Sequence, residues 1–454
     1  MSSESIPSNT DPYEWYSAFP LLPNVSIRLI RLLPLQVGET DDADLACEQL
    51  LYCLEPPERV DYVALSYTWG NPTRDKPIAD KDGTEHLEND ATGPRKTRKI
   101  YYRGRGLPIT QNLYDLLVLI RHREHHGWLW ADAICINQDD IIERGWQVLL
   151  MSQIYSKATN VFIWLGKADE HTELAWTSIK ILGTALQYFL TEEVKALINS
   201  NPINDSAVWG SLGITEFKPA QWRALGILLT RCWFTRVWTL QEAALGQYSL
   251  VWCGGYSMDH SILRRVALFL FTSQWYKIPT EAVKGYHLKD GWDPGFAVQL
   301  GLSAVAQQSS HGLEDNVSRR LTNWQCVADA LYTFVTRPLV HEATDRRDFI
   351  YALLPLASLH RKLLHDTMLK PDYSKPFQLV WAEATLYMIN ELEDLNILAH
   401  AQSRIVCVGG TAYEEHAVTV DGLPSWVPLY DRRNLPYLRP QDFDAMGERK
   451  HVGE

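Results

Sequence analysis

The sequence predicts an α/β protein with a parallel β-sheet core, a helical insertion and a mainly helical C-terminal region. Residues 128–166 have the pattern strand, loop, helix and strand in one unbroken piece. This pattern is typical of a βαβ unit, whose two strands run parallel. Strands alternate with helices up to about residue 253, and helices alone follow. With 454 residues, the chain exceeds the usual size of one hydrophobic core, so we expect two structural units.

The βαβ unit is predicted from three short patterns. Residues 128–136 are short and apolar, as in a strand that is buried on both faces. Asp140, followed three residues later by Glu143, predicts a capping box at the start of a helix. One apolar helix stripe follows, made of Leu150, Met151, Ile154, Tyr155 and Ala158. A second strand is expected over residues 161–165, and Gly166 ends it.

The remaining elements are placed in chain order by the same periodicities. Before the βαβ unit, we expect a strand over 25–35, a strand over 61–70, a charged loop over 72–100, a strand or hairpin over 99–107 and a helix over 110–123. After it, we expect helices over 166–231 with a polar interruption at 199–205, a helix ending near Gly246 and a strand over 249–253. Two C-terminal helices are expected over 324–335 and over 377–384, with Pro376 at the first turn of the second.

These patterns suggest five segments. They are a polar N-terminal segment (1–24), a first domain (25–276), a junction of weak periodicity (277–320), a helical C-terminal region (321–431) and a polar tail (432–454).

Composition and charge exclude several classes of function. The net charge of −12 argues against a general nucleic-acid binder, and we read the local basic run 95–105, beside the acidic run 80–90, as a solvated loop. The seven cysteines are scattered, with no CxxC pair, and the N-terminus has no signal-peptide pattern. Free thiols in a reducing compartment are therefore expected. No apolar stretch approaches the ~20 residues of a membrane-spanning helix. A cytoplasmic protein without a membrane span is predicted.

Several common chemistries lack their residues. His122, His125 and His126 cluster near a helix end without a set of metal ligands around them, so no metal is predicted. Gly104 and Gly106 lack the helix-opening context of a dinucleotide fingerprint. The chain contains no GxxxxGK[ST] loop and no GxSxG elbow, which argues against nucleotide hydrolysis and against an esterase. No bound cofactor is predicted.

Three long segments carry a resemblance to a known family. They are YVALSYTWG (62–70), the βαβ unit with LWADAICINQDD and VFIWLG (128–166), and RCWFTRVWTLQEAALG (231–246). In this order they resemble the motifs of the fungal heterokaryon incompatibility (HET) domain. Three later segments, ATDRRDFIYALLPLAS, KPDYSKP and LPSWVPLYD, also resemble family sequence, although in the first of them Arg346 and Pro355 replace a typical Pro and Gly. The resemblance assigns the HET domain to residues 25–276. The polar tail fits either a short family member or an incomplete gene model.

The resemblance implies both a fold and a function. HET domains are thought to be distant relatives of the TIR superfamily, whose core is a flavodoxin-like parallel sheet. The implied function is fungal non-self recognition, a form of innate immunity, in which the domain triggers programmed cell death. An incompatibility partner protein and self-association are implied with it. The alternative is a non-enzymatic signalling module that acts through protein–protein contacts, and fold alone does not choose between them.

A candidate binding site lies at the carboxyl ends of the parallel strands, where open α/β sheets bind ligands. One strand end carries Ser66, Tyr67, Trp69 and Gly70. The next strand carries Asp132 and ends in Asn137 and Gln138. These residues are expected to line a solvent-reachable cleft with aromatic walls. The alternative is that the aromatic residues are packing and that the polar run only caps a helix.

Glu242 is the candidate catalytic residue. It lies four residues after Trp238, so the two share a helix face, and a carboxylate beside Trp would have its pKa raised by desolvation. W-T-L-Q-E also resembles the catalytic W-x-x-x-E pattern of TIR-type NAD glycohydrolases, which implies NAD as a substrate and Glu242 as the acid that stabilises an oxocarbenium-like transition state. Thr239 stands where many TIR sequences have Cys. The alternative is a helix-surface Glu paired with Arg231 or Arg236.

Overall fold

The computed structural model describes most of the chain, and every structural statement below concerns these residues. They are residues 12–23, 25–35, 44–55, 59–73, 78–79, 85–86, 89–90, 93–187, 204–286, 342–354, 369–401, 405–406, 416–417 and 422–430. The chain divides into two compact units, Met1–Leu313 and Glu314–Glu454. The division falls inside the junction predicted over 277–320, where the structure also places a short helix, Lys277–Ala282.

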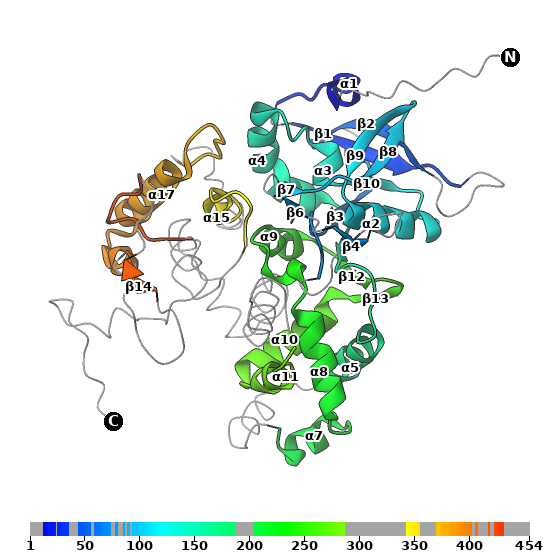
Figure 1. Cartoon of the computed structure of the whole chain (residues 1–454), viewed down its shortest axis with the longest axis vertical. Coiled ribbons are helices and arrows are strands. Elements are labelled where there is room, and N and C mark those ends of the chain that lie inside the picture. The colour runs from blue at the N-terminus through cyan, green and yellow to red at the C-terminus, as the bar shows by residue number, and fades with distance from the viewer. Residues whose placement is uncertain are drawn as a thin grey trace. The chain divides into compact units, whose positions relative to one another are not determined.

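A nine-stranded sheet forms the core of the first unit (Figure 1). Its strands are β1 (Ser26–Leu32), β2 (Leu45–Cys53), β3 (Tyr62–Ser66), β8 (Arg98–Tyr102), β9 (Arg105–Ile109), β10 (Trp128–Trp130), β11 (Asn160–Trp164), β12 (Ser249–Cys253) and β13 (Tyr256–Asp259). They lie in the order β13-β12-β11-β3-β10-β1-β2-β8-β9. Short separate pairs join β4 (Ile78–Ala79) with β5 (Glu85–His86), β6 (Asn89–Asp90) with β7 (Gly93–Pro94), and β14 (Ile405–Val406) with β15 (His416–Ala417).

The sheet is mixed, with four adjacent parallel strands at its centre. β12, β11, β3 and β10 pair in parallel with one another. β1 runs antiparallel to both β10 and β2, β2 pairs in parallel with β8, and the edge pairs β8–β9 and β12–β13 are antiparallel. The expected parallel sheet therefore needs correction outside the centre. The edge pairs are antiparallel because turns of two residues, Arg103–Gly104 and Gly254–Gly255, join their strands.

The connections between the parallel strands reverse direction at one place. Numbered along the chain, β3, β10, β11 and β12 lie in the order 2-1-3-4 across the sheet. The chain moves from β3 to one side to form β10 and then crosses back to form β11. The position between β3 and β11 is therefore the topological switch point, at which open α/β sheets bind ligands.

Helices cover both faces of the centre of the sheet. The helices of the first unit are α1 (Pro12–Ser17), α2 (Gln111–His122), α3 (Asp132–Cys135), α4 (Ile141–Lys157), α5 (Thr172–Ala185), α7 (Ser206–Leu212), α8 (Pro219–Leu229), α9 (Trp238–Leu245), α10 (His260–Thr272) and α11 (Lys277–Ala282), with the 3-10 turn η1 (Cys232–Thr235). The second unit contains α15 (Asp348–Tyr351), α17 (Phe377–Leu392) and η4 (Asn396–His400). Figure 1 shows α5, α8, α10 and α11 together beside the β12–β13 edge.

Contacts along β11 show which helices share a face. A Cβ on Gly246, just after α9, would lie 2.6 Å from Cγ2 of Val161. Trp164 instead donates from Nε1 to Oδ1 of Asn112 in α2, at 2.8 Å. Since successive side chains of a strand alternate between faces, α9 and α2 cover opposite faces of the sheet. α4 packs beside α9, and its Tyr155 donates to the carbonyl oxygen of Leu65 in β3.

Several predicted elements match the structure closely. α2 begins after Thr110, whose Oγ1 accepts from the backbone N–H of Leu113 at 3.5 Å. The hairpin β8–β9 turns at Arg103 and Gly104, both with positive φ. Strand β12 has the predicted bounds, and α17 follows directly after Pro376. The helix expected over 324–335 and the tail over 432–454 lie outside the described residues.

Other predictions were wrong, each for a local reason. The strand expected over 128–136 ends at Trp130, because residues from Asp132 onward turn into the short helix α3. Strand β2 was not predicted, because the polar Gln49 occupies a buried position and breaks its alternation. β13 was not predicted either. In the segment expected to be polar, 1–24, helix α1 buries Trp15, whose ring packs edge-on against Tyr102 at 6.1 Å.

The cap of α4 is only half of the predicted capping box. Asp140 is the N-cap, and its Oδ1 accepts from the backbone N–H groups of Ile142 and Glu143 at 2.9 and 3.0 Å. Glu143 does not reach back to the cap, because its carboxylate forms a buried ion pair with Arg28 of β1. The start of α4 is therefore held both by the Asp140 cap and by the ion pair with Arg28 of β1.

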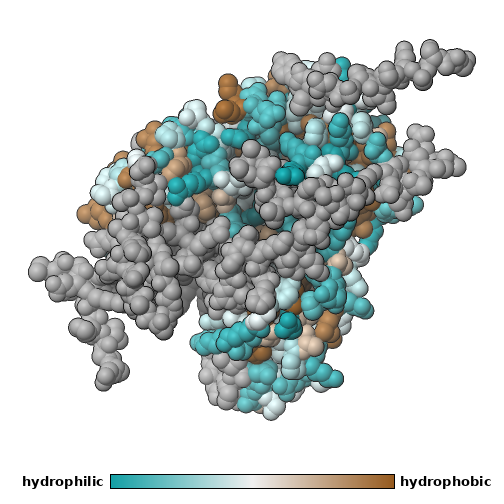
Figure 2. Space-filling view, in the orientation of Figure 1, coloured by the Kyte–Doolittle hydropathy of each residue, from teal (hydrophilic) through white to brown (hydrophobic). Residues whose placement is uncertain are grey.

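The surface of the first unit is mixed in character. Figure 2 shows hydrophilic residues with apolar ones scattered between them over the described face of this unit. The cysteines within the described ranges, namely Cys47, Cys53, Cys135, Cys232 and Cys253, are free thiols. Among the described helices, none has both the length and the apolar character to cross a bilayer.

Candidate functional site

The candidate site lies at the switch point, where β3 ends at Ser66. The hydroxyl of Ser66 donates to Oε2 of Glu242 at 2.5 Å. The indole N–H of Trp233 donates to the same Ser66 oxygen at 2.8 Å. Ser66 and Trp233 are 0% exposed and Glu242 is 3% exposed, so the three side chains form a buried chain of hydrogen bonds.

The start of α9 is locked so that Glu242 faces β3. Thr239 donates from Oγ1 to the carbonyl oxygens of Trp233 and Arg236, at 3.1 and 2.8 Å. These bonds tie the first turn of α9 to η1. Trp238 is half-buried one turn before Glu242, as expected from their spacing. A hydroxyl at position 239 thus has a structural role in placing the acid.

Glu242 has an unusual acidity. Burial raises its pKa from 4.5 to about 7, although the positive charge of Arg236 and the hydrogen bond from Ser66 lower it and the charge of Asp132 raises it further. Near neutral pH, the carboxyl group is therefore close to the midpoint of its titration. Strongly shifted acids of this kind are concentrated at functional sites.

A second polar cluster follows directly along the chain. Asp132 accepts from the Tyr67 hydroxyl at Oδ1 (2.8 Å) and from the Trp69 indole N–H at Oδ2 (2.7 Å). It also accepts from the backbone N–H of Ala133 at 2.8 Å, at the start of α3. The expectation that Asp132 lies within a strand is therefore wrong, since it begins a helix. Burial raises the pKa of the Tyr67 hydroxyl well above its ordinary value, so this hydroxyl remains a donor.

The loop after β3 is held from both faces of the sheet. On the α9 face, Arg236 donates from Nη1 to the carbonyl oxygen of Tyr67. On the α2 face, Asn112 donates from Nδ2 to the carbonyl oxygen of Thr68 at 2.7 Å, and Trp164 fixes the other end of the Asn112 amide. The backbone between Ser66 and Trp69 therefore has little freedom to move.

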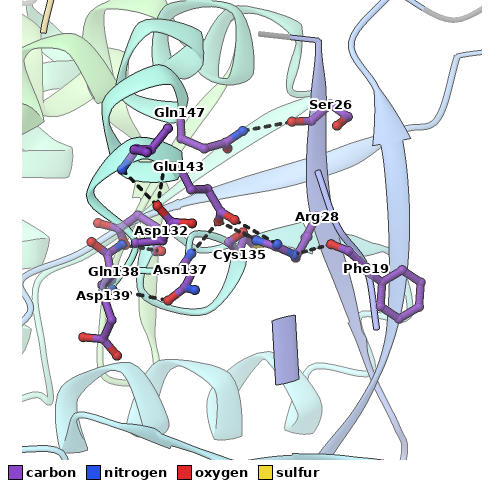
Figure 3. Close-up of polar contacts among 12 residues, drawn as sticks. Phe19, Ser26, Arg28, Asp132, Cys135, Asn137, Gln138, Asp139, Glu143 and Gln147 are labelled. Carbon is purple, nitrogen blue, oxygen red and sulfur yellow. Dashed lines mark hydrogen bonds and ion pairs between the residues drawn. The ribbon is translucent and has the colours of Figure 1, made fainter. Parts of the chain in front are cut away.

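The loop after β10 is held by a buried network (Figure 3). Arg28 makes a bidentate pair with Glu143, at 2.6 and 3.0 Å, and also donates to the carbonyl oxygen of Cys135 at 3.1 Å. Oε1 of Glu143 accepts the backbone N–H of Asn137 at 2.6 Å. Gln138 donates from Nε2 to the carbonyl oxygen of Asp132 at 2.9 Å. Asn137 and Gln138 thus shape the loop that carries Asp132.

The loop after β11 has its own anchor. Arg231 donates to the carbonyl oxygens of Leu165 and Lys167 at 2.7 and 2.9 Å and pairs with Asp169 at 2.7 Å. Burial would raise the pKa of Asp169, but the charge of Arg231 and the hydrogen bonds to the carboxylate outweigh it and lower the pKa. Gly166 allows the turn, since its φ is +98° and a Cβ there would lie 2.5 Å from Pro72.

The structure brings most of the predicted site residues to one edge of the sheet. Ser66 contacts Glu242, while Tyr67, Trp69 and Gln138 all bond to Asp132. Asn137 lies in the same loop, but its backbone N–H donates to Glu143 and its side-chain oxygen accepts from the backbone N–H of Asp139. Gly70 is buried at the end of the loop after β3, and Trp238 lies one turn from Glu242.

Two expectations about Glu242 need correction. The carboxyl group was expected to face a solvent-reachable cleft, yet at 3% exposure it is closed off in this conformation. The alternative of a helix-surface Glu is also wrong, because Glu242 is buried and Arg231 pairs with Asp169. The interaction expected with Arg236 is present as a positive charge that lowers the pKa of Glu242. The short helix α9 buries both its sheet-facing side and its flanks, which sequence spacing alone does not reveal.

Three residues of the site were not predicted from the sequence, namely Trp233, Arg28 and Asn112. Trp233 lies in the third motif, but its spacing does not show that it reaches Ser66. Arg236 was considered only as an ion-pair partner of Glu242, and its bond to the carbonyl oxygen of Tyr67 was not expected. Arg28 and Asn112 lie outside the motifs, and an arginine among the apolar residues of β1 was the signal available for the first. Within the described ranges, no group of three or more His, Cys, Asp or Glu side chains is arranged to hold a metal ion.

Comparisons with known proteins agree with these motifs. The family model described as Heterokaryon incompatibility protein (HET) matches residues 62–242, which span β3 to α9. The chain is 27% identical over 453 aligned residues to "Heterokaryon incompatibility protein 6, OR allele" of Neurospora crassa, and the match covers 92% of this chain. The chain spans about 60% of the length of that relative. No solved structure matches the chain.

Proposed function

We propose that this chain acts in fungal non-self recognition, as a HET-domain protein whose response ends in programmed cell death. The match of residues 62–242 and the similarity to a Neurospora incompatibility protein support this proposal. The 2-1-3-4 order of the parallel strands is that of the first four strands of a flavodoxin-like sheet, which supports the relationship to TIR domains. An incompatibility partner protein belongs to this function, and the cytoplasm is its proposed location.

The biochemical part of the proposal is cleavage of NAD at the bond between nicotinamide and ribose. The observation that carries it is Glu242, a buried acid with a pKa of about 7 at the switch point. In the ionised form, this carboxylate would stabilise the positive charge that develops on the ribose as the bond breaks. Nicotinamide leaves with the bonding electron pair, and water adds to the ribose carbon and gives up a proton. The edge formed by Tyr67, Trp69 and Asp132 is the proposed ribose-binding wall.

Catalysis requires Glu242 to become accessible. Its carboxyl group is 3% exposed and bonded to Ser66 in the single chain. We therefore place the opening of the site in self-association, which changes the packing around α9. The single chain is then a resting state, and the active form is an oligomer.

Nicotinamide release tests the enzymatic proposal. The wild-type chain, Glu242→Gln and the control Glu173→Gln are compared in oligomeric samples, with Glu173 chosen because it is an exposed Glu on α5. We expect Glu242→Gln to lower the rate about a hundredfold, as loss of a catalytic carboxylate does, and Glu173→Gln to leave it unchanged. Equal release from all three proteins would exclude Glu242 as the catalytic residue, and no release from the oligomeric wild type would exclude the reaction.

A non-enzymatic signalling module is the second candidate, and the closed state of Glu242 favours it. Under this alternative, the conformation of the loops after β3 and β10 is read by a partner protein. Expression of the same three proteins in fungal cells separates the candidates. Cell death that survives Glu242→Gln supports signalling by contact, whereas loss of cell death together with loss of nicotinamide release supports the enzyme.

A further inference from the structure

Trp233 lies in the third motif but was given no role when the candidate site was predicted. In the structure, its side chain contacts Ser66 by donating a hydrogen bond to the serine oxygen. It is fully buried in η1 and packs edge-on against Phe234 at 5.3 Å and His260 at 6.5 Å. Its single polar atom, Nε1, donates to Oγ of Ser66 at 2.8 Å. A packing role alone needs only the ring, so the direction of the N–H bond calls for a separate explanation.

The bond from Trp233 determines what Ser66 can do. A serine hydroxyl has one hydrogen to donate and can accept through its oxygen. Because the indole has no acceptor, it can only donate to Ser66, and the Ser66 hydrogen is then directed to Oε2 of Glu242 at 2.5 Å. A hydroxyl that accepts one bond is polarised and donates the next more strongly. The three residues therefore form a directed chain from indole to acid.

We propose that Trp233 is a positioning residue for Glu242, and that the Trp233–Ser66–Glu242 chain is a lock: once self-association has opened the site, a ligand must still displace the Ser66 hydroxyl to reach the carboxyl group. The catalytic meaning of the lock rests on the proposed function. Its existence does not, because the state of the Glu242 carboxyl group can be measured without substrate. Trp233 acts through Ser66 and does not itself touch the ligand.

The surroundings of Glu242 fit a locked acid. The charged and titratable groups that face it come from three other segments: Arg236 before α9, Asp132 at the start of α3, and Tyr155 on α4. Arg236 favours the ionised carboxylate and Asp132 opposes it. Ser66 is the group that bonds directly to the carboxylate, so it is the contact that a ligand would replace.

The test is a titration of Glu242 in the full-length chain. The protein is labelled with ¹³C at the glutamate carboxyl carbon, and the Glu242 signal is assigned by its loss in Glu242→Gln. Wild type, Ser66→Ala and Trp233→Phe are then titrated with pH. The control is Trp176→Phe, since Trp176 is also buried, at 3% exposure, and its N–H donates to the carbonyl oxygen of Ser257 at 3.1 Å, away from the site.

We expect the midpoint of the Glu242 titration to rise most in Ser66→Ala, by a smaller amount in Trp233→Phe, and not at all in Trp176→Phe. Ser66→Ala removes the hydrogen bond to Glu242 that favours its ionised form. Trp233→Phe keeps this bond but weakens it, because the Ser66 hydroxyl is no longer polarised or oriented by the indole N–H. A shift in Ser66→Ala with none in Trp233→Phe would overturn the role of Trp233. Equal shifts in Trp233→Phe and Trp176→Phe would do the same, because the effect would then come from core packing.

A change of ring shape can be avoided altogether. Benzothienylalanine at position 233 keeps the fused ring and lacks the N–H, so it serves if Trp233→Phe does not fold.

The nicotinamide assay is run in parallel on the same variants. Absence of any activity in the wild type removes the proposed reaction but leaves the titration result standing. A titration unaffected by removal of the N–H removes the lock but leaves the reaction standing.

Discussion

Glu242 shows how one buried side chain links the stability of this protein to pH. An acid whose pKa rises on folding binds its proton more tightly in the folded state. Between 4.5, its ordinary value, and about 7, the folded chain therefore holds more protons than the unfolded chain. The contribution to stability is fully present below pH 4.5 and is lost as the pH rises through about 7.

Glu242→Gln should remove this dependence. A difference between 4.5 and about 7 corresponds to on the order of 3 kcal/mol. We expect the variant to gain about that much stability relative to the wild type when the pH is raised from 4 to 8. Urea unfolding at a series of pH values measures it. The exposed Glu173→Gln is the control, and a wild-type slope that persists in Glu242→Gln would contradict the assignment.

At the scale of elements, the loop after β10 depends on strand β1 for its shape. Arg28 and Glu143 are both buried and form a bidentate pair (Figure 3). Arg28 also donates to the carbonyl oxygen of Phe19, and Glu143 accepts from the backbone N–H of Asn137 in the loop. On the same strand, Arg31 pairs with Glu48, with side chains 42% and 47% exposed. Breaking a buried pair leaves a charge without a partner, whereas an exposed pair is solvated in either state.

The two pairs on β1 provide a matched experiment. Arg28→Met or Glu143→Gln should destabilise the chain by about 3–5 kcal/mol, and Arg31→Met or Glu48→Gln by less than about 1 kcal/mol. Double-mutant cycles on both pairs, followed by chemical unfolding, give the coupling energies. Similar losses at the two pairs would show that the network in Figure 3 does not hold the loop.

Prediction from sequence succeeded where a signal was local. The start of α2 next to Thr110, the strand β12 and the start of α17 after Pro376 each depend on residues within one turn or one strand. It failed where a partner far along the chain decides the outcome. Glu143 was assigned to its own helix cap because nothing nearby in the sequence reveals Arg28, 115 residues away.

The candidate site follows the same rule. The placement of Ser66 and Glu242 at one sheet edge could be expected from strand ends and motif order, since parallel strands end on the same side. The burial of Glu242 and the role of Trp233 could not be predicted, because they depend on contacts with Ser66 that span 176 and 167 positions of the chain. The antiparallel pairing of β1 with β10 could not be predicted either, because the direction of β1 is set by the arrangement of the whole sheet.

At the scale of the whole molecule, the division after Leu313 predicts an independent folding unit. Residues 1–313 contain the nine-stranded sheet and every residue of the candidate site. We expect this portion, purified alone, to give one cooperative thermal transition and an aromatic circular-dichroism signal. The comparison is residues 1–230, which lack η1 and α9 and should show neither. A non-cooperative transition for residues 1–313 would mean that the second unit is needed for folding.

The three loops at the site edge are each fastened by an arginine from elsewhere in the chain: Arg28, Arg231 and Arg236. Two of these arginines lie after position 230, so a ribosome must translate past helix α8 before these two loops can be held in place. Arg236 donates a hydrogen bond to the carbonyl oxygen of Tyr67, 169 residues upstream. A prematurely terminated product would therefore carry the first two family segments without an assembled centre. For a protein whose output is proposed to be lethal, that makes interrupted synthesis harmless to the cell that produces it.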